Sequence, residues 1–493
     1  MPAAHVARQR ASRVAGVPHQ LTDFVKAYDV RGLVPEQLDV DVAWALGAAF
    51  AEVVVAREGG TGCVIGHDMR ATSPELSQAF GTGVASRGVD VTHIGLASTD
   101  QLYFASGSLD LAGAMFTASH NPAAYNGIKL CRPGARPVGQ DSGLAEVRDL
   151  AQEILDGTGE LRRSDVGATT DRDVLADYAG FLRGLVDLSG GRPLTVVVDA
   201  GNGMAGHTVP AVLGTQAGLP ELPLTIIPLY FELDGTFPNH EANPLEPENL
   251  RDLQAAVVEH GADLGLAFDG DADRCFVVDE RGEPVSPSAI TALIATREVA
   301  REVAAGRTPQ DVAIVHNVIT SAQVPEVIAG LGARAVRTRV GHSFIKGEMA
   351  RADAVFGGEH SAHYYFRDFW FADTGMLAAM HVLAALGEQD GPLSALMGDY
   401  TAYVASGEIN STVDDQAAST EAVRAWAADK DVTVDELDGL TLTHAGSGND
   451  DTMWWLNLRA SNTEPLLRLN VEAADADTMA RVRDDVLTIV RGS

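Results

Sequence analysis

The sequence is poor in lysine and in cysteine. Its 493 residues include only four lysines, and arginine fills nearly every other basic position. Three of the four lie in polar motif segments: Lys26 in KAYDVRG, Lys129 in the segment 113–129, and Lys346 in VGHSFIK. The three cysteines, Cys63, Cys131 and Cys275, lie far apart and lack the spacing of a zinc site. We therefore predict a reducing, cytoplasmic compartment for this protein.

Long apolar runs and a surplus of positive charge are also missing. No run of about 18 apolar residues occurs, so we expect no contact with a membrane. Residues 1–20 contain arginines but no apolar signal core, and we expect a flexible tail there. The net charge is −32, from 68 acidic and 36 basic residues, which argues against a nucleic-acid partner. A site for an anionic substrate must therefore gather its own positive groups.

The chain has the composition of a globular protein, with 46% hydrophobic and 21% charged residues. Its length predicts several domains of roughly 100–200 residues each. Apolar segments of strand and helix character alternate through most of the chain, which favours covered, mostly parallel sheets. The pattern predicts three α/β domains followed by a small α+β domain, with boundaries at 21–168, 169–284, 285–401 and 402–493.

Some elements can be placed from the sequence with definite bounds. Apolar residues at helical spacing predict a helix over 38–55, and the last domain is expected to contain a helix over 420–428. A short apolar run predicts a strand over 354–356. The polar segment 162–172 is expected to link the first two domains.

A polar loop follows an apolar strand in the first domain. The segment 113–129 reads GAMFTASHNPAAYNGIK, so that Ser119 and His120 stand at the mouth of the strand and Lys129 follows ten residues later. Proline and glycine break this loop and exclude a helix. A hydroxyl that is chemically modified needs an acid or base within hydrogen-bond reach, and this loop offers one.

Three carboxylates follow a buried strand in the second domain. Asp269, Asp271 and Asp273 occupy alternate positions in the segment DGDADR, where a turning loop can bring three oxygens to one Mg²⁺. An EF-hand is rejected, because Arg274 replaces the required glycine and a strand follows. A phosphatase loop with Asp269 as nucleophile stays an alternative.

Two further polar segments are candidates for substrate recognition. Glu359, Ser361 and His363, in GEHSAH, offer a carboxylate, a hydroxyl and an imidazole at alternate positions, a set suited to neighbouring sugar hydroxyls. The segment 459–465, RASNTEP, offers a guanidinium, hydroxyls, an amide and turn N–H groups, which is the composition of a phosphate cradle.

Taken together, the segments TASHNP, DGDADR, GEHSAH and RASNTEP, one per domain and in this order, resemble the α-D-phosphohexomutase family. The segments YDVRG, DAGNG and DGTFPNHEANP are also similar to its pattern. The resemblance covers nearly the whole chain after residue 21. It is strongest to the bacterial phosphomannomutase/phosphoglucomutase branch, because the sugar loop reads GEHSAH.

The resemblance implies a fold and a set of site residues. It implies four domains around a central cleft, three related α/β domains with mixed sheets and a C-terminal α+β domain of TATA-box-protein-like shape. It implies Mg²⁺ held by Asp269, Asp271, Asp273 and the phosphate on Ser119. It implies catalytic roles for Ser119, His120, Lys129 and Arg31. It implies a substrate-binding set made up of Tyr28, Arg274, His342, Glu359, Ser361, His363, Arg459, Ser461, Asn462, Thr463 and Arg468. One departure concerns His316, which stands where many relatives have a lysine.

The function implied is the interconversion of hexose 6-phosphate and hexose 1-phosphate, with mannose first and glucose second. Phosphorylated Ser119 would make a hexose 1,6-bisphosphate, which would turn end for end; the bisphosphate would also act as activator. A phosphoglucomutase or phosphoglucosamine mutase is the alternative within the family. Outside it stand a Mg²⁺-dependent sugar phosphatase and an inactive sugar-phosphate-binding protein. We expect a monomer or homodimer that binds neither nucleic acid nor a membrane.

Overall fold

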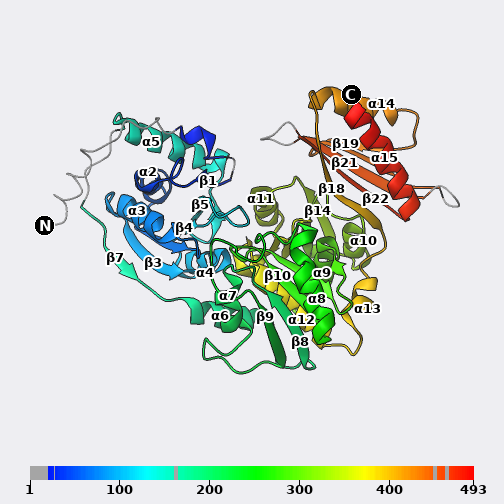
Figure 1. Ribbon diagram of the computed structural model, residues 1–493, viewed down its shortest axis with the longest axis horizontal. Helices are drawn as coiled ribbons and strands as arrows, with labels where there is room; N and C mark the ends of the chain where they lie inside the picture. Colours follow the sequence, from blue (N-terminus) through cyan, green and yellow to red (C-terminus); the bar gives the residue numbers. More distant parts are fainter. Residues whose placement is uncertain (1–19, 27, 160–164, 448–451, 461–465, 493) are drawn as a thin grey trace.

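The computed structural model describes residues 20–26, 28–159, 165–447, 452–460 and 466–492 (Figure 1). Four sheets organise these residues, and each belongs to one structural unit. The first three units combine parallel and antiparallel strands with covering helices, whereas the sheet of the fourth is antiparallel throughout its described pairs. The predicted fold class, three related α/β units and a C-terminal α+β unit, is confirmed.

The first unit is built on a sheet in the order β1-β5-β4-β2-β3-β7, with β6 paired to β5. Its strands are β1 (Val30–Leu33), β2 (Gly62–His67), β3 (Asp90–Leu96), β4 (Ala112–Phe116), β5 (Tyr125–Arg132), β6 (Arg136–Pro137) and β7 (Thr169–Asp171). Its helices are α2 (Val40–Phe50), α3 (Ser73–Ala85), α4 (Thr99–Leu109) and α5 (Leu144–Asp156). The helix expected over 38–55 continues past α2 as a π-helical segment, Ala51–Ala56. The expected linker 162–172 contributes β7, which pairs in parallel with β3.

The second unit carries a sheet in the order β12-β11-β10-β8-β9. Its strands are β8 (Leu194–Asp199), β9 (Leu224–Leu229), β10 (Leu264–Phe268), β11 (Cys275–Asp279) and β12 (Pro284–Val285). Its helices are α6 (Leu175–Leu185), α7 (Ala205–Val212) and α8 (Arg251–His260). Strand β10 is buried at every position, so the loop that follows it leaves the core of the unit directly.

The third unit carries a sheet in the order β14-β13-β15-β16-β17. Its strands are β13 (Ala313–Asn317), β14 (Arg334–Thr338), β15 (Phe356–Gly358), β16 (Tyr364–Phe366) and β17 (Ala372–Asp373). Its helices are α9 (Pro287–Ala304), α10 (Gln323–Gly330), α11 (His342–Ala352), α12 (Gly375–Gly387) and α13 (Leu393–Gly398). The strand expected over 354–356 is wrong by two residues at each end, because β15 pairs with β16 as far as Gly358 opposite Tyr364.

The fourth unit carries a sheet in the order β18-β22-β21-β20-β19, with two helices packed along it. Its elements are β18 (Val404–Thr412), α14 (Gln416–Trp426), β19 (Thr433–Asp435), β20 (Leu440–His444), β21 (Trp454–Ala460), β22 (Leu466–Ala473) and α15 (Ala476–Gly492). The helix expected over 420–428 begins earlier, because the Asp415 side chain accepts the N–H of Ala418 and caps its start.

The first three sheets share one strand topology. In each, the first long strand (β2, β8 or β13) pairs in parallel on both sides, and the strand on one side (β4, β10 or β15) is followed by an antiparallel partner (β5, β11 or β16). The loops between these last two strands are 117–124, 269–274 and 359–363. They carry the three polar motifs of the α/β units, so each motif occupies the same place in its sheet.

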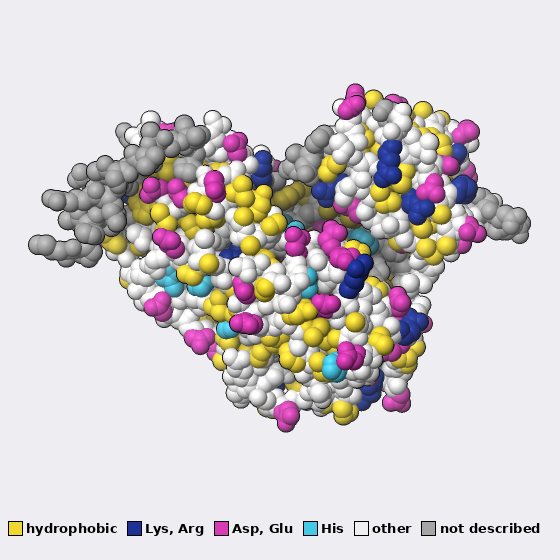
Figure 2. All heavy atoms as spheres, viewed as in Figure 1, with side chains coloured by type: hydrophobic (Ala, Val, Ile, Leu, Met, Phe, Trp, Pro, Cys, Tyr) yellow, Lys and Arg dark blue, Asp and Glu magenta, His cyan; other side chains and the backbone are white. Residues whose placement is uncertain are grey.

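The four units do not share one core equally. One cluster of buried apolar residues runs through the first three units, from Val64 to Met397. The fourth unit has its own cluster, from Val413 to Val490. Figure 2 shows the surface hollowed between the first unit and the fourth. Among the described residues, no helix combines the length and the apolar character that crossing a bilayer requires.

A buried carboxylate joins the first three units. Asp100, at the start of α4, accepts hydrogen bonds from Tyr178 of the second unit (2.6 Å) and Thr374 of the third (2.7 Å) through Oδ2. Ser98 of its own unit donates to Oδ1. Burial raises the pKa of Asp100 to about 6. Since an unpaired buried carboxylate is costly, these donors tie the three units to one point.

We predict that Tyr178→Phe lowers the free energy of unfolding by about 1–3 kcal/mol, because it leaves the buried Asp100 carboxylate without one donor. Urea titration followed by circular dichroism measures the change. The matched control is Tyr230→Phe, which removes an exposed hydroxyl 2.6 Å from Asp252 and should stay within about 0.5 kcal/mol of the parent protein. Equal stability of the two variants would contradict the view that the donors to Asp100 stabilise the fold.

Candidate active site

Ser119 lies in the loop between β4 and β5 with its hydroxyl turned toward the second unit. Its Oγ donates to Oδ2 of Asp269 (2.7 Å) and lies 3.1 Å from Nδ1 of His120. The backbone adopts the left-handed region with φ 49°, and its N–H donates to Thr117 Oγ1 (2.9 Å). A non-glycine residue in this region stores strain that the surroundings must hold in place. The predicted hydroxyl, imidazole and carboxylate therefore meet.

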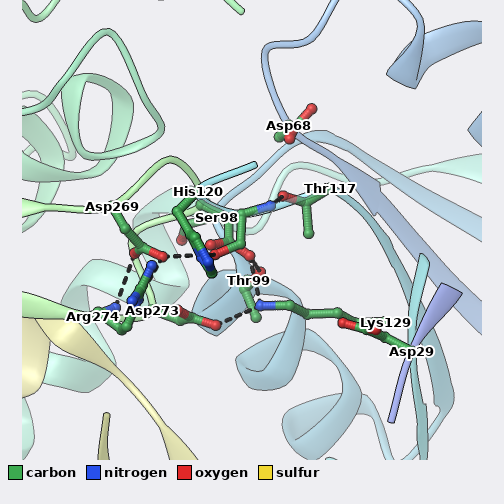
Figure 3. A network of polar contacts seen from close by, with 12 residues as sticks. Asp29, Asp68, Ser98, Thr99, Thr117, His120, Lys129, Asp269, Asp273 and Arg274 are labelled. Carbon is green, nitrogen blue, oxygen red and sulfur yellow. Dashed lines mark hydrogen bonds and ion pairs between the residues drawn. The ribbon is translucent and has the colours of Figure 1, made fainter. Parts of the chain in front are cut away.

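His120 is held as a neutral imidazole. Burial, together with the nearby Arg274 and Arg31 guanidinium groups, moves the pKa of His120 well below its ordinary value. At neutral pH the ring can therefore accept a proton or share one with the Ser119 hydroxyl. Figure 3 shows His120, Asp269 and Arg274 gathered at one side of this network.

The three predicted carboxylates converge in the loop between β10 and β11. Ligand oxygens of Asp269, Asp271 and Asp273 lie within 4.8 Å of one another, and all three side chains are buried. Oδ1 of Asp271 and Oδ1 of Asp273 have no hydrogen-bond partner among the described residues. Buried carboxylate oxygens without partners are costly, and a hard divalent cation satisfies them. The residues present therefore fit Mg²⁺.

Two basic side chains balance this acidic loop. Nζ of Lys129 lies 2.7 Å from Oδ2 of Asp271. It lies 2.5 Å from Oδ2 of Asp273, and Nε of Arg274 lies 2.9 Å from Oδ2 of Asp269; Figure 3 shows these two pairs. The two carboxylates raise the pKa of Lys129 above its ordinary value against the effect of burial. The ammonium in turn holds the pKa of Asp271 below its ordinary value.

The loop between β15 and β16 reaches the acidic loop from the third unit. Nε2 of His363 lies 3.6 Å from Oδ1 of Asp273, and its Nδ1 lies 3.1 Å from Oγ of Ser361. Residues 274 and 363 also form a β-bridge between the two loops. The ring of His363 therefore borders the acidic loop and is only partly buried.

Glu359 is more enclosed than the sequence suggests. Its Oε1 accepts from Asn317 (3.2 Å) and from the N–H of Gly341 (3.0 Å), and Oε2 accepts from the Tyr365 hydroxyl (2.9 Å). The residue is 2% exposed. Both carboxylate oxygens are therefore engaged by protein donors in this state, and contact between Glu359 and a sugar stays a prediction.

The residues predicted near the start of the chain line the junction of the first and third units. Arg31 donates to Asp29 (2.9 Å) and to Asn121 of the serine loop (2.5 Å). The ring of Tyr28 packs edge-on against His342, with centroids 5.0 Å apart. Burial lowers the pKa of His342 to about 3 and raises that of Tyr28. His342 is therefore a neutral ring in contact with the first unit.

The fourth unit brings two guanidinium groups side by side. Arg459 of β21 and Arg468 of β22 are directly opposite in the strand register, and both approach Glu408, at 3.5 and 3.3 Å. Nε of each has no hydrogen-bond partner among the described residues. Arg459 also lies 3.9 Å from Oδ2 of Asp438, so two carboxylates face the two arginines, and the Nε donors without partners are the groups that an anion could engage. Ser461, Asn462 and Thr463 lie outside the described residues.

His316 cannot replace a lysine ammonium. It is a buried residue of β13, and its Nδ1 lies 3.1 Å from the carbonyl of Asn317. Burial lowers the pKa of His316 to about 4, so the ring is neutral at neutral pH.

Two side chains that contribute to the site carry no motif signal. Thr99 donates to Oδ2 of Asp271 (2.5 Å), and its N–H donates to the Asp271 carbonyl. Arg70 places its guanidinium against the carbonyls of the serine loop. Both follow strands of the first sheet, β3 and β2, and their place after these strands is the sequence signal that could have found them.

Comparison with known proteins identifies these units. Profiles of the four phosphoglucomutase/phosphomannomutase domains match in order: alpha/beta/alpha domains I, II and III match residues 23–156, 176–282 and 286–403, and the C-terminal domain matches residues 408–489. The matches together span most of the chain and follow the units of the structure.

Curated relatives and solved structures agree with this result. A phosphomannomutase of Salmonella typhimurium is 40% identical over 459 residues, covering 92% of this chain and 95% of the relative. A protein named phosphohexose mutases, from Xanthomonas campestris, is 38% identical and covers 95% and 99%. A crystal structure of a phosphoglucomutase/phosphomannomutase family protein from Burkholderia thailandensis is 30% identical with a TM-score of 0.81, covering 95% of this chain and 97% of that one.

A divalent cation provides the test of the acidic loop. We predict that Asp271→Asn weakens Mg²⁺ binding by about 100-fold or more. Changes to residues that only support the metal ligands already cost about 10–100-fold in affinity, and Asp271 is itself a predicted ligand. Isothermal titration calorimetry measures the affinity. Asp279→Asn, which changes a buried carboxylate at the end of β11 of the same unit, is the control and should bind Mg²⁺ as the parent does. Equal affinities in both variants would remove Asp271 from the site.

Proposed function

The chain belongs to the phosphoglucomutase/phosphomannomutase family and is a phosphohexomutase, and from this premise we propose that Ser119 carries the phosphoryl group that it transfers. The observation that carries the proposal is the 2.7 Å contact between Ser119 Oγ and Asp269, beside the unpartnered oxygens of the acidic loop. A phosphoryl group on Oγ would lie against three carboxylates, so it requires the cation for which these residues are suited.

The proposed chemical step is a transfer between two oxygens. The bond from phosphorus to Ser119 Oγ breaks as a bond from phosphorus to a free hydroxyl oxygen of the hexose monophosphate forms. The hydroxyl gives up its proton, and His363 is the group at the acidic loop that could receive it, whereas Lys129 is already an ammonium and would orient the phosphoryl group. His120, 3.1 Å from Oγ, is the group through which a proton would return to the serine oxygen, because a neutral imidazole can donate from one ring nitrogen while it accepts at the other. The product is a hexose 1,6-bisphosphate.

Asp269, Asp271 and Asp273 would hold Mg²⁺ together with an oxygen at Ser119. When bound, the ion neutralises charge on the transferring group, which is the main requirement of phosphoryl transfer. Arg274 fixes the orientation of Asp269 by engaging both of its oxygens, Oδ2 through Nε (2.9 Å) and Oδ1 through the backbone N–H (3.1 Å). Oδ1 of Asp271 and Oδ1 of Asp273 keep no hydrogen-bond partner among the described residues.

The return half of the reaction requires the bisphosphate to turn end for end. Arg459 and Arg468 would hold the phosphate that is not reacting, with Ser461, Asn462 and Thr463 completing the cradle. Arginine suits this role, since its planar guanidinium can donate two parallel hydrogen bonds to a phosphate in either half of the cycle. Ser361 and Glu359 would read the sugar hydroxyls, and Tyr28, Arg31 and His342 would line the same space.

We further propose mannose phosphates as the preferred substrates, with glucose phosphates second. The support is that several relatives near 40% identity are named phosphomannomutase.

A hexose 1,6-bisphosphate would restore phosphate to Ser119 whenever hydrolysis removes it. Hydrolysis through Asp269 as a nucleophile is the second candidate, and its support is the position of Asp269 directly after a buried strand.

We predict that Ser119→Ala lowers mutase turnover by about 1,000-fold or more, because the group that carries the phosphate is lost. A coupled assay with glucose 1,6-bisphosphate as activator measures the rate. Ser77→Ala, which removes another buried hydroxyl of the first unit, is the control and should retain activity. Near-parental turnover of Ser119→Ala, or phosphate recovered on Asp269 instead of Ser119, would contradict the proposal.

The sugar preference has its own test. We predict that kcat/KM for mannose 1-phosphate exceeds that for glucose 1-phosphate by up to about tenfold, because one inverted hydroxyl changes one hydrogen bond worth about 1 kcal/mol. Initial rates with the two sugars, and with glucosamine 1-phosphate as a third substrate, provide the comparison. A higher value for glucose or glucosamine would overturn the assignment of mannose.

A further inference from the structure

The guanidinium of Arg70 lies at the centre of the serine loop. Nη1 donates to the carbonyls of Pro122 (2.9 Å) and Tyr125 (3.0 Å), and Nη2 donates to those of Ser119 (3.0 Å) and Asn121 (2.7 Å). All four N–H groups of the two terminal nitrogens are thus directed at one loop. Arg70 itself is 2% exposed.

The remaining face of the guanidinium is fixed by its own segment. Nε lies 3.3 Å from Oδ2 of Asp68, and the other oxygen of Asp68 accepts from the Arg70 N–H (3.0 Å) and the Ser73 hydroxyl (2.6 Å). Asn126, at the far end of the serine loop, donates to the Ser73 hydroxyl (2.9 Å). The segment 68–73 therefore holds both ends of the loop that carries Ser119.

The second unit covers Arg70 from the other side. The ring of Phe237 lies 5.1 Å from the guanidinium carbon, a cation–π contact. Gly235 packs so closely that a Cβ there would lie 2.7 Å from Cα of Arg70. The proline-rich loop 234–247 thus contacts Arg70, which in turn holds the serine loop.

The carbonyl of Ser119 is constrained twice. It accepts from Arg70, and a Cβ at Gly270 of the acidic loop would lie 2.4 Å from the same oxygen. With its carbonyl held on one side by a donor and on the other by a backbone, Ser119 stays in the left-handed conformation. That conformation turns Oγ toward Asp269. Arg70 does not touch Oγ, so it acts through the backbone of the loop.

We propose that Arg70 is the positioning residue that holds Ser119 in the conformation for phosphoryl transfer, with Phe237 of the second unit holding the guanidinium in place. The proposal rests on the proposed role of Ser119. Lysine cannot replace this arginine, because one ammonium has three donors and cannot reach four carbonyls spread over seven residues. Misplacement of a reacting group by about 1 Å costs about 100-fold in rate, which sets the size of the expected effect.

The test compares Arg70→Lys with Arg87→Lys in the full-length protein. Arg87 is another largely buried arginine of the first unit, and its guanidinium is bound to Glu52 of the same unit at 2.8 Å. For Arg70→Lys we expect kcat about 30–100-fold lower, with KM within about twofold. Amide exchange should rise in the peptide 117–126 and stay unchanged in the peptide 40–56. Arg87→Lys should match the parent in kcat and in exchange of 117–126.

Two results would overturn the proposal. One is a kcat for Arg70→Lys within about threefold of Arg87→Lys. The other is a rate loss accompanied by faster exchange throughout the first unit, which a merely structural role produces. If Arg70→Lys does not fold, Phe237→Leu decides: we expect kcat about 3–10-fold lower with KM unchanged, and an unchanged kcat overturns the proposal.

The design separates this proposal from the role of Ser119. Mass spectrometry of the parent protein after incubation with glucose 1,6-bisphosphate shows whether Ser119 carries phosphate. If it does not, the proposed function fails, while exchange of the peptide 117–126 still decides whether Arg70 holds the loop. If it does, and Arg70→Lys exchanges and turns over like Arg87→Lys, the positioning role fails alone.

Discussion

Three buried carboxylates within 4.8 Å of one another set the central constraint on this molecule. Like charges in a low-dielectric interior repel, so the acidic loop exists only where other groups balance it. The balancing groups come from separate units: Lys129 and Thr99 from the first, Arg274 from the second, and the partly covered ring of His363 from the third. Placing the units correctly and balancing the charge of the site are therefore one structural problem. Asp100, next to Thr99 in the sequence, joins the same three units through its hydrogen bonds.

A repeated topology solves this problem with three similar pieces. Each polar loop connects a parallel strand to its antiparallel neighbour, and each contains a non-glycine residue in the left-handed region: Ser119, Ala272 and Ala362. Each loop is also braced by the end of the first long strand of its own sheet or by the segment that follows it. The braces are the Arg70 guanidinium, the N–H of Met204 on the Gly270 carbonyl (2.9 Å), and the Asn317 amide on Glu359. The same scaffold thus presents a hydroxyl, a set of carboxylates and an imidazole.

The sequence was sufficient to predict the fold class and the family, because the motifs are local strings that follow apolar strands. It also predicted that Ser119 and Asp269 belong to one site, 150 residues apart and now in contact. Element ends were predicted less well: Asp415 starts α14 earlier than hydrophobic spacing indicates. Arg70 and Thr99 were not predicted, since their partners lie 49 and 172 residues away and no local pattern records such distances. Glu359 was predicted to face a sugar, yet its carboxylate is engaged by protein donors whose identity depends on the folded sheet.

The separate apolar core of the fourth unit has a mechanical consequence. Described contacts between this unit and the third include polar ones, such as Arg337 with Asp435 (2.9 Å) and the N–H of Val340 with Asp438 (2.9 Å). Such polar contacts can be replaced by contacts with water at a small net cost in free energy. Separating the apolar cluster shared by the first three units would expose apolar surface to water, which costs more. Thermal motion should therefore swing the arginine pair as a rigid arm about the chain segment 399–403, while the serine and the carboxylates keep their mutual distances. If the bisphosphate proposed above forms, such an arm would follow its free phosphate as it turns while the reacting atoms stay in place.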